Sequence, residues 1–235
     1  MSAWNKKRQL IPEPFVWQVF ESLCSAVHYM HHGPEPHVST AAWSAVSHRD
    51  IIPSNIFLQR EHPAGKILPD AQDTQPYPWT VKLGDFGCAM TIKEFVEKDY
   101  ELNDPNLATI DVDFDPPNGP YVDESTNIFQ VGLIMGMMYR MSDDTANDEV
   151  YYAQDESDLE EVPGDNVCKE GFLDHSHHPG FYGYSTDLRS LVLKCLYEDM
   201  EHRWSARRLL NHIKMVTDSI NQYGVMPQAK PLFDD

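Results

Sequence analysis

Two short polar segments contain the residue types in this sequence that are best suited to chemistry. The first is His48–Asn55, with the pattern H-R-D-x-x-x-x-N, and the second is Asp85-Phe86-Gly87. A carboxylate can accept a proton from a hydroxyl, and carboxylate and amide oxygens are the ligands that a hard cation such as Mg²⁺ takes. Each residue could instead serve a turn, as loop carboxylates and amides often do. Both segments in one chain, in this order, favour a catalytic site.

The two patterns together resemble the protein kinase superfamily and lean towards its serine/threonine branch. Ile11–Phe15 resembles the start of the helix that leads into a kinase catalytic loop. Asn127–Gly132 resembles the buried central helix of the large lobe, and Asp199–Arg203 resembles the closing segment of that lobe. The resemblance covers residues 10–220, which correspond to the large C-terminal lobe. It implies transfer of phosphate from ATP to Ser or Thr hydroxyls of proteins.

The resemblance implies a role for the polar residues of both segments. Asp50 would accept or orient the proton of the substrate hydroxyl, with Asn55 as its catalytic companion. Asn55 and Asp85 would hold Mg²⁺ and thereby bind ATP. Phosphoryl transfer depends on such positioning and on neutralising the migrating charge. The implied cofactors are ATP and Mg²⁺, and the implied partners are a protein substrate or a regulatory protein.

Further residues would have regulatory roles by the same resemblance. Arg49 would reach a phosphorylated activation segment, for which Thr91 and Thr109 are the candidate sites. Phe86 would pack inside the lobe and set whether the preceding aspartate points at the metal ion. Cys88 would border the nucleotide pocket, and we expect a buried structural thiol because no neighbouring base lowers its pKa.

The sequence also departs from the family pattern at positions that support catalysis. Ile52 replaces the usual lysine that contacts the transferring phosphate, and loss of one such charge costs about 10²–10³ in rate. Asn118 replaces a glutamate, so that its usual partner Arg203 needs another acid or water. Asp111 replaces a threonine that helps to seat the substrate. Asn127 replaces the aspartate that braces the catalytic loop, and its amide can still form hydrogen bonds.

The first residues of the chain contain no counterpart of the kinase small lobe. Gly33 is the only glycine before His48, so these residues cannot form a Gly-rich loop. Lys6 and Lys7 lie in a polar segment that lacks the pattern of a strand. We therefore expect a lone large lobe with an exposed apolar face. Two hypotheses follow: an impaired serine/threonine kinase, or a catalytically inactive pseudokinase lobe that acts as a scaffold or regulator.

The elements that must position these residues are mostly helical. Apolar residues at helical spacing predict a helix from Pro14 to His32, and Thr80–Gly84 reads as a strand. The segment Ile128–Met141 is apolar on every side, which is typical of a fully buried helix. Ser185 and Ser205 can cap two further amphipathic helices. The predicted fold is mainly α (α+β), a kinase-like C-terminal lobe with a small β element at the catalytic loop.

The composition suggests one main domain with loops and a tail. We assign residues 1–221 to the lobe and 222–235 to a C-terminal tail. Within the lobe, a Pro- and Asp-rich insertion occupies about 60–79, and an acidic loop occupies about 142–166.

Charge and cysteine content narrow the possible partners and compartments. The 235 residues have a formal net charge of −19, which disfavours nucleic acid and anionic membrane surfaces as partners. The four cysteines include no C-x-x-C pair, which suits reduced thiols. We expect a soluble, intracellular protein, either cytoplasmic or nuclear.

Structural metal sites are not predicted from sequence. His31, His32 and His37 flank the end of the first helix without a Cys or carboxylate at ligand spacing, which favours solvated side chains. The acidic region has no D-x-D-x-D-G calcium loop, and Cys168 with the histidines of 174–178 matches no standard zinc spacing.

Overall fold

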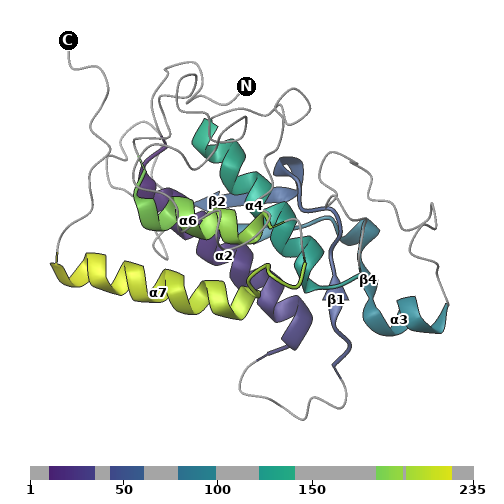
Figure 1. The fold of residues 1–235 in the computed structure, drawn as a ribbon. Coiled ribbons are helices and arrows are strands. Elements are labelled where there is room, and N and C mark those ends of the chain that lie inside the picture. The colour runs from purple at the N-terminus through teal and green to yellow at the C-terminus, as the bar shows by residue number, and fades with distance from the viewer. Residues whose placement is uncertain are drawn as a thin grey trace, which may run out of the picture.

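The computed structural model describes residues 11–34, 43–60, 79–98, 122–140, 184–197 and 200–223. Helices dominate these segments, as predicted (Figure 1). The elements, in chain order, are α2 (Glu13–His32), β1 (Val46–Ser47), η2 (Pro53–Asn55), β2 (Ile56–Arg60), β3 (Trp79–Leu83), η3 (Phe86–Cys88), β4 (Met90–Thr91), α3 (Ile92–Glu97), α4 (Glu124–Arg140), α6 (Thr186–Cys195) and α7 (Ala206–Tyr223).

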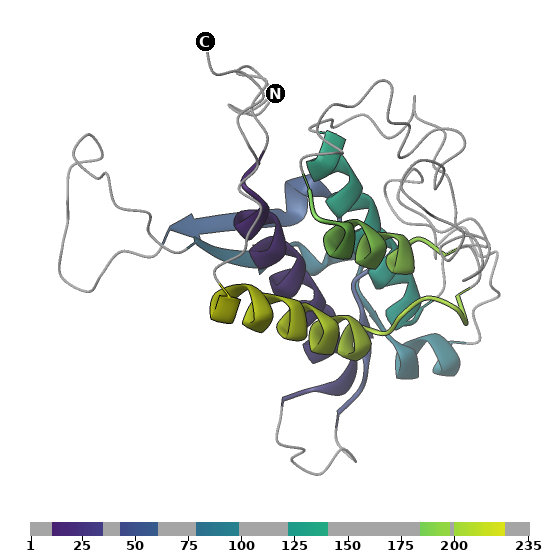
Figure 2. The same cartoon turned by 60° about the vertical axis from the view of Figure 1, so that its left-hand side comes forward.

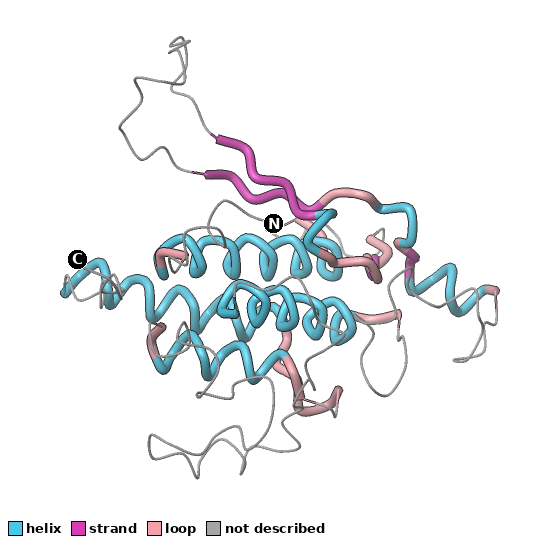
Figure 3. The backbone as a smooth tube through the Cα atoms, turned by 90° about the horizontal axis from the view of Figure 1, so that it is seen from above, coloured by secondary structure: helices cyan, strands magenta, loops and turns pink. Residues whose placement is uncertain are grey.

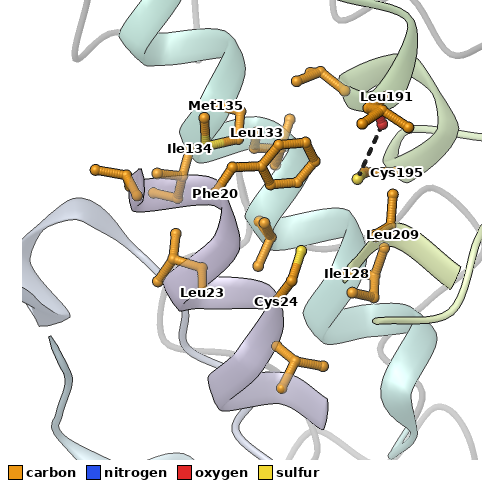
Figure 4. Close-up of a cluster of buried hydrophobic side chains, with 14 of the residues drawn as sticks. Phe20, Leu23, Cys24, Ile128, Leu133, Ile134, Met135, Leu191, Cys195 and Leu209 are labelled. Atoms are coloured by element: carbon orange, nitrogen blue, oxygen red, sulfur yellow. Dashed lines mark hydrogen bonds between the residues drawn. The ribbon is translucent and has the colours of Figure 1, made fainter. Parts of the chain in front are cut away.

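The core lies between helices α2, α4, α6 and α7, which pack side by side in Figures 2 and 3. The buried face of α2 repeats every three or four residues, as an amphipathic helix requires. Figure 4 shows Phe20 and Cys24 of this face directed towards α4 and α6. The fully buried side chains include Val16, Phe20, Val27, Ile128, Phe129, Met135, Leu188, Cys195, Leu209 and Ile213.

Helix α4 is buried on all sides from Thr126 to Met137, which confirms the interpretation of the apolar sequence for that part of the helix. Gly132 allows the close approach of α6, because a Cβ atom there would lie 2.7 Å from Cβ of Cys195 and 2.8 Å from Cδ2 of Leu196. The side chain of any other residue would push the two helices apart. The small residue therefore sets the distance between α4 and α6.

Two short antiparallel sheets lie beside the helices in the described part of the chain. β2 pairs with β3 from Ile56–Leu83 to Arg60–Trp79, and β1 pairs with β4 through Val46–Thr91 and Ser47–Met90. The predicted insertion thus connects two paired strands, where added chain length costs little. The hairpin β2–β3 projects from the helical body in Figure 2.

The predicted helix caps are present. The hydroxyl of Ser185 accepts the N–H of Leu188 at 3.3 Å, and that of Ser205 accepts the N–H of Arg208 at 3.3 Å. The expected insertion (60–79), acidic loop (142–166) and tail (222–235) fall outside the described residues, apart from positions 60, 79, 222 and 223. Among the described helices, none is long and apolar enough to cross a membrane.

Candidate active site

The catalytic-loop segment lies buried between β1 and η2. His48, Arg49, Asp50 and Asn55 are each less than a tenth exposed, although all four side chains are polar. Buried polar groups need hydrogen-bond partners. Their partners therefore show how the sequence holds this loop in place.

Helix α4 holds the backbone of the loop through Asn127. Its Oδ1 accepts the N–H groups of His48 and Arg49, both at 3.1 Å, and the hydroxyl of Ser47 at 3.4 Å. The amide oxygen thus does the bracing expected of an aspartate. Its Nδ2 is buried and, in the described segments, has no hydrogen-bond partner, which is the energetic cost of an amide at this position.

Gln130, one turn further along α4, completes the contact with the loop. Its Oε1 accepts the N–H of Ile51 at 3.1 Å, and its Nε2 donates to the carbonyl of Arg49 at 3.0 Å. Arg49 itself has φ of +66°, a left-handed conformation that a non-glycine residue adopts only when its surroundings impose it. We did not predict this role for Gln130, although it is the one amide within the apolar run from Ile128 to Tyr139, which was a usable signal.

Asp50 and Asn55 form one hydrogen-bonded unit. Nδ2 of Asn55 donates to the carbonyl of Asp50 at 2.9 Å and to its Oδ2 at 2.8 Å. The other carboxylate oxygen of Asp50, Oδ1, is buried and has no hydrogen-bond partner within the described part of the chain. Because Asn55 uses its amide nitrogen to hold Asp50, its Oδ1 is the atom that can bind a cation.

His48 connects the catalytic loop to the segment around Asp85. Its Nδ1 accepts the N–H of Asp50 at 3.3 Å, so its Nε2 carries the proton and donates to the carbonyl of Gly84 at 3.1 Å. Burial lowers the pKa of His48, against the opposing effect of the Gly84 hydrogen bond and of Asp50 and Asp85. A neutral imidazole is the form that this pair of hydrogen bonds requires.

Asp85 lies next to the end of the loop that carries Asn55. The N–H of Gly84 donates to the carbonyl of Asn55 at 2.9 Å, which fixes the position of the following residue. Asp85 has φ of +59° and accepts the N–H of Gly87 at 3.2 Å. The structure thus places the backbone of Asn55 beside the residue that precedes Asp85, and carboxylate and amide oxygens are of the kind that suits Mg²⁺.

The expectation that Phe86 packs inside the lobe is wrong for this structure. Its side chain is 51% exposed, and its ring meets the edge of His48 with centroids 4.7 Å apart. The D-F-G motif specifies a phenylalanine at this position, but the burial of that side chain depends on neighbouring residues outside the motif.

Other predicted site residues have clear structural partners. Ile52 packs against the hydrophobic core, and its side chain has no charge that could bind a phosphate as the usual lysine does. Thr91 caps α3 by accepting the N–H of Glu94 at 3.0 Å, and Nη1 of Arg49 donates to the carbonyl of Cys88 at 3.5 Å. Three predicted positions lie outside the described residues: Thr109, Asp111 and Asn118.

Arg203, whose usual glutamate partner is replaced by Asn118 in the sequence, contacts backbone carbonyls and an aromatic ring. Its Nε donates to the carbonyl of Tyr197 at 2.6 Å and its Nη1 to that of Ser125 at 3.3 Å. The guanidinium also lies over the ring of Phe129, 4.8 Å from its centroid. Backbone carbonyls and an aromatic face therefore stabilise this buried cation.

Comparison with known proteins identifies the family. A model of the protein kinase domain matches residues 1–214, and the chain therefore belongs to the protein kinase family. This match begins at residue 1, so it does not confirm the predicted absence of the small lobe.

Two relatives are similar over much of the chain. It is 26% identical over 213 residues to the membrane-associated tyrosine- and threonine-specific cdc2-inhibitory kinase wee-1.3 of Caenorhabditis elegans. This match covers 88% of the chain and 23% of the C. elegans protein. It is also 28% identical over 164 residues to the probable serine/threonine-protein kinase iksA of Dictyostelium discoideum. This second match covers 61% of the chain and 15% of the D. discoideum protein. The chain thus spans less than a quarter of the length of either curated relative.

Proposed function

We propose that the chain transfers phosphate from ATP to a protein hydroxyl, slowly, with Asp50 as the group that receives the hydroxyl proton. The observation that carries this proposal is the unequal use of the two Asp50 oxygens. Asn55 holds Oδ2, while Oδ1 is buried and has no hydrogen-bond partner among the residues that the structure describes. A buried acceptor without a partner is costly, so its retention is explained if a substrate hydroxyl supplies the missing hydrogen bond.

The surrounding residues support this role by fixing geometry. Asn127 and Gln130 hold the loop backbone, and His48 ties it to Gly84. Asn55 and Asp85 would hold Mg²⁺, which when bound neutralises charge on the phosphates of ATP. Preorganised groups of this kind need no rearrangement during the reaction.

The proposed acceptor of the phosphate is a threonine side chain. The names of both relatives include threonine, one together with tyrosine and the other with serine. Peptides that carry only threonine, only serine or only tyrosine would therefore identify the acceptor directly. The proposed partner is a protein substrate.

A scaffold without catalytic activity is the second candidate, and Ile52 favours it. This side chain packs against the core and offers no charge to the transferring phosphate. Ile52→Lys separates the two candidates, because a working site would gain rate, by about 10²–10³-fold, whereas a scaffold would gain none.

The direct test measures phosphate transfer from radiolabelled ATP to a threonine peptide in the presence of Mg²⁺. Asp50→Asn keeps the shape and the bond to Asn55 but removes the proton acceptor, and we expect a loss of about 10²–10⁴-fold. Asp218→Asn, an exposed residue of α7, is the matched control. Equal activity in Asp50→Asn and the unaltered chain would overturn the proposal.

A further inference from the structure

Two helices, α2 and α4, bring two histidines and a glutamate together at a place separate from the candidate active site. His28 and His32 lie one turn apart near the end of α2, and Glu124 begins α4. One nitrogen or oxygen atom from each of the three lies within 4.8 Å of the others. The end of α2 meets the starts of α4 and α7 in Figures 1 and 2.

The distances are close to those of a metal site. Nε2 of His32 lies 3.8 Å from Oε1 of Glu124, and the rings of His28 and His32 have centroids 4.6 Å apart. Bonds of about 2.0 Å to a tetrahedral zinc ion separate its ligand atoms by about 3.3 Å. Small side-chain rotations are therefore enough to bring the three atoms to one ion. Two histidines four residues apart on a helix are also a known zinc-binding spacing.

The three residues suit zinc chemically. Imidazole nitrogen and carboxylate oxygen are both zinc ligands, and three protein ligands leave a fourth position for water. The side chain of His32 is 40% exposed and that of Glu124 is 15% exposed, so an ion can enter from solvent. A neutral imidazole nitrogen is the form of histidine that binds a metal ion.

Glu124 already has a structural partner that is compatible with metal binding. Its Oε1 accepts the N–H of Ala206 at 3.1 Å, at the start of α7. A carboxylate has a second oxygen and can accept several bonds. An ion bound to this side chain would therefore connect α2 and α4 directly and α7 through Ala206.

We propose that His28, His32 and Glu124 bind a zinc ion that joins the ends of these three helices. The sequence pattern favours solvated side chains for His31, His32 and His37, because no carboxylate lies at ligand spacing from them along the chain. The fold supplies that carboxylate from a residue far along the chain, and His28 from the previous turn of α2.

The test measures zinc binding to the full chain after treatment with EDTA and dialysis. Isothermal titration is expected to give one tight site per chain, and zinc is expected to raise the unfolding temperature reversibly with EDTA. His32→Gln and the double variant His28→Gln/His32→Gln are expected to weaken binding by more than about 10-fold. His202→Gln is the matched control, because this histidine is exposed and lies outside the cluster.

Two further measurements and one further variant distinguish loss of the metal site from loss of the fold. Circular dichroism of each variant shows whether it folds, and Glu124→Gln removes the proposed ligand on the other helix. The absorption spectrum of the cobalt-substituted chain is expected to lack the thiolate charge-transfer band that a cysteine ligand produces. Zinc binding that survives the double variant, a thiolate band, or the absence of tight binding to the unaltered chain would each overturn the proposal.

Discussion

A single side chain, Asn127, holds the strained start of the catalytic loop. Asn127→Leu removes the acceptor of two backbone N–H groups while keeping a similar volume. Because those donors are buried, we expect the free energy of unfolding to fall by roughly 2–5 kcal/mol. Urea unfolding followed by circular dichroism measures this change. Asn211→Leu, at an exposed position of α7, should change stability by no more than about 0.5 kcal/mol; similar losses in both variants would contradict the bracing role.

The pH dependence of stability should report the neutral state of His48. Burial lowers its pKa in the folded chain below the ordinary value of 6.5, so the unfolded chain binds protons more readily. Its contribution to stability is therefore complete above the unfolded pKa and is lost as the pH falls towards the folded pKa.

We expect His48→Gln to reduce this dependence. The measurement is the free energy of unfolding in urea at pH values of about 7.5 and 5.5 for both proteins. His202→Gln serves as the control because its ring is exposed. If the loss of stability on acidification is as large in His48→Gln as in the unaltered chain, the proton is taken up elsewhere.

At the scale of elements, the contact between α4 and α6 depends on Gly132. In Gly132→Ala, the new methyl group would meet Cβ of Cys195 at 2.7 Å, and a backbone-anchored atom cannot rotate away. Overpacking costs about 1–3 kcal/mol, whereas alanine gains at most about 1 kcal/mol in helix propensity. We expect a net loss of stability in thermal unfolding. Asn211→Ala on exposed α7 gains propensity without a new contact, and it should be neutral or slightly stabilising.

Elements whose signals are local were predictable from sequence. The periodicity of α2, the uniform apolarity of α4 and the capping serines of α6 and α7 each lie within a few residues of the element they define. The order of the H-R-D and D-F-G patterns also located Asp50, Asn55 and Asp85, because the family pattern itself is local.

Features that depend on contacts between distant segments were not predictable. Gln130 binds the loop from about 80 positions along the chain, and Glu124 approaches His32 only because α2 and α4 pack against each other. Phe86 illustrates the reverse case: the motif implied burial, but the packing around it leaves the ring exposed. Sequence patterns thus predicted the candidate site residues, whereas the tertiary fold determined which side chains contact them.

The molecule as a whole combines a high net charge with exposed apolar side chains near the β2–β3 hairpin. Phe57, Leu58, Trp79 and Phe86 are between 39% and 54% exposed, and exposed apolar surface favours association. A net charge of −19 opposes it by repulsion between copies, which salt screens within about 10 Å at moderate ionic strength. Self-association should therefore increase as salt is added.

Phe57→Ser/Leu58→Ser should weaken this response without lowering the unfolding temperature, because both side chains are about half exposed. Static light scattering across a salt series measures association, and binding of a hydrophobic dye measures the exposed apolar surface. Val96→Ser is the matched control, since Val96 is 68% exposed but lies on α3 rather than on the hairpin. If Val96→Ser reduces association as much as the hairpin variant, general surface polarity explains the effect. If only the hairpin variant does so, the hairpin is the surface through which copies of this chain meet.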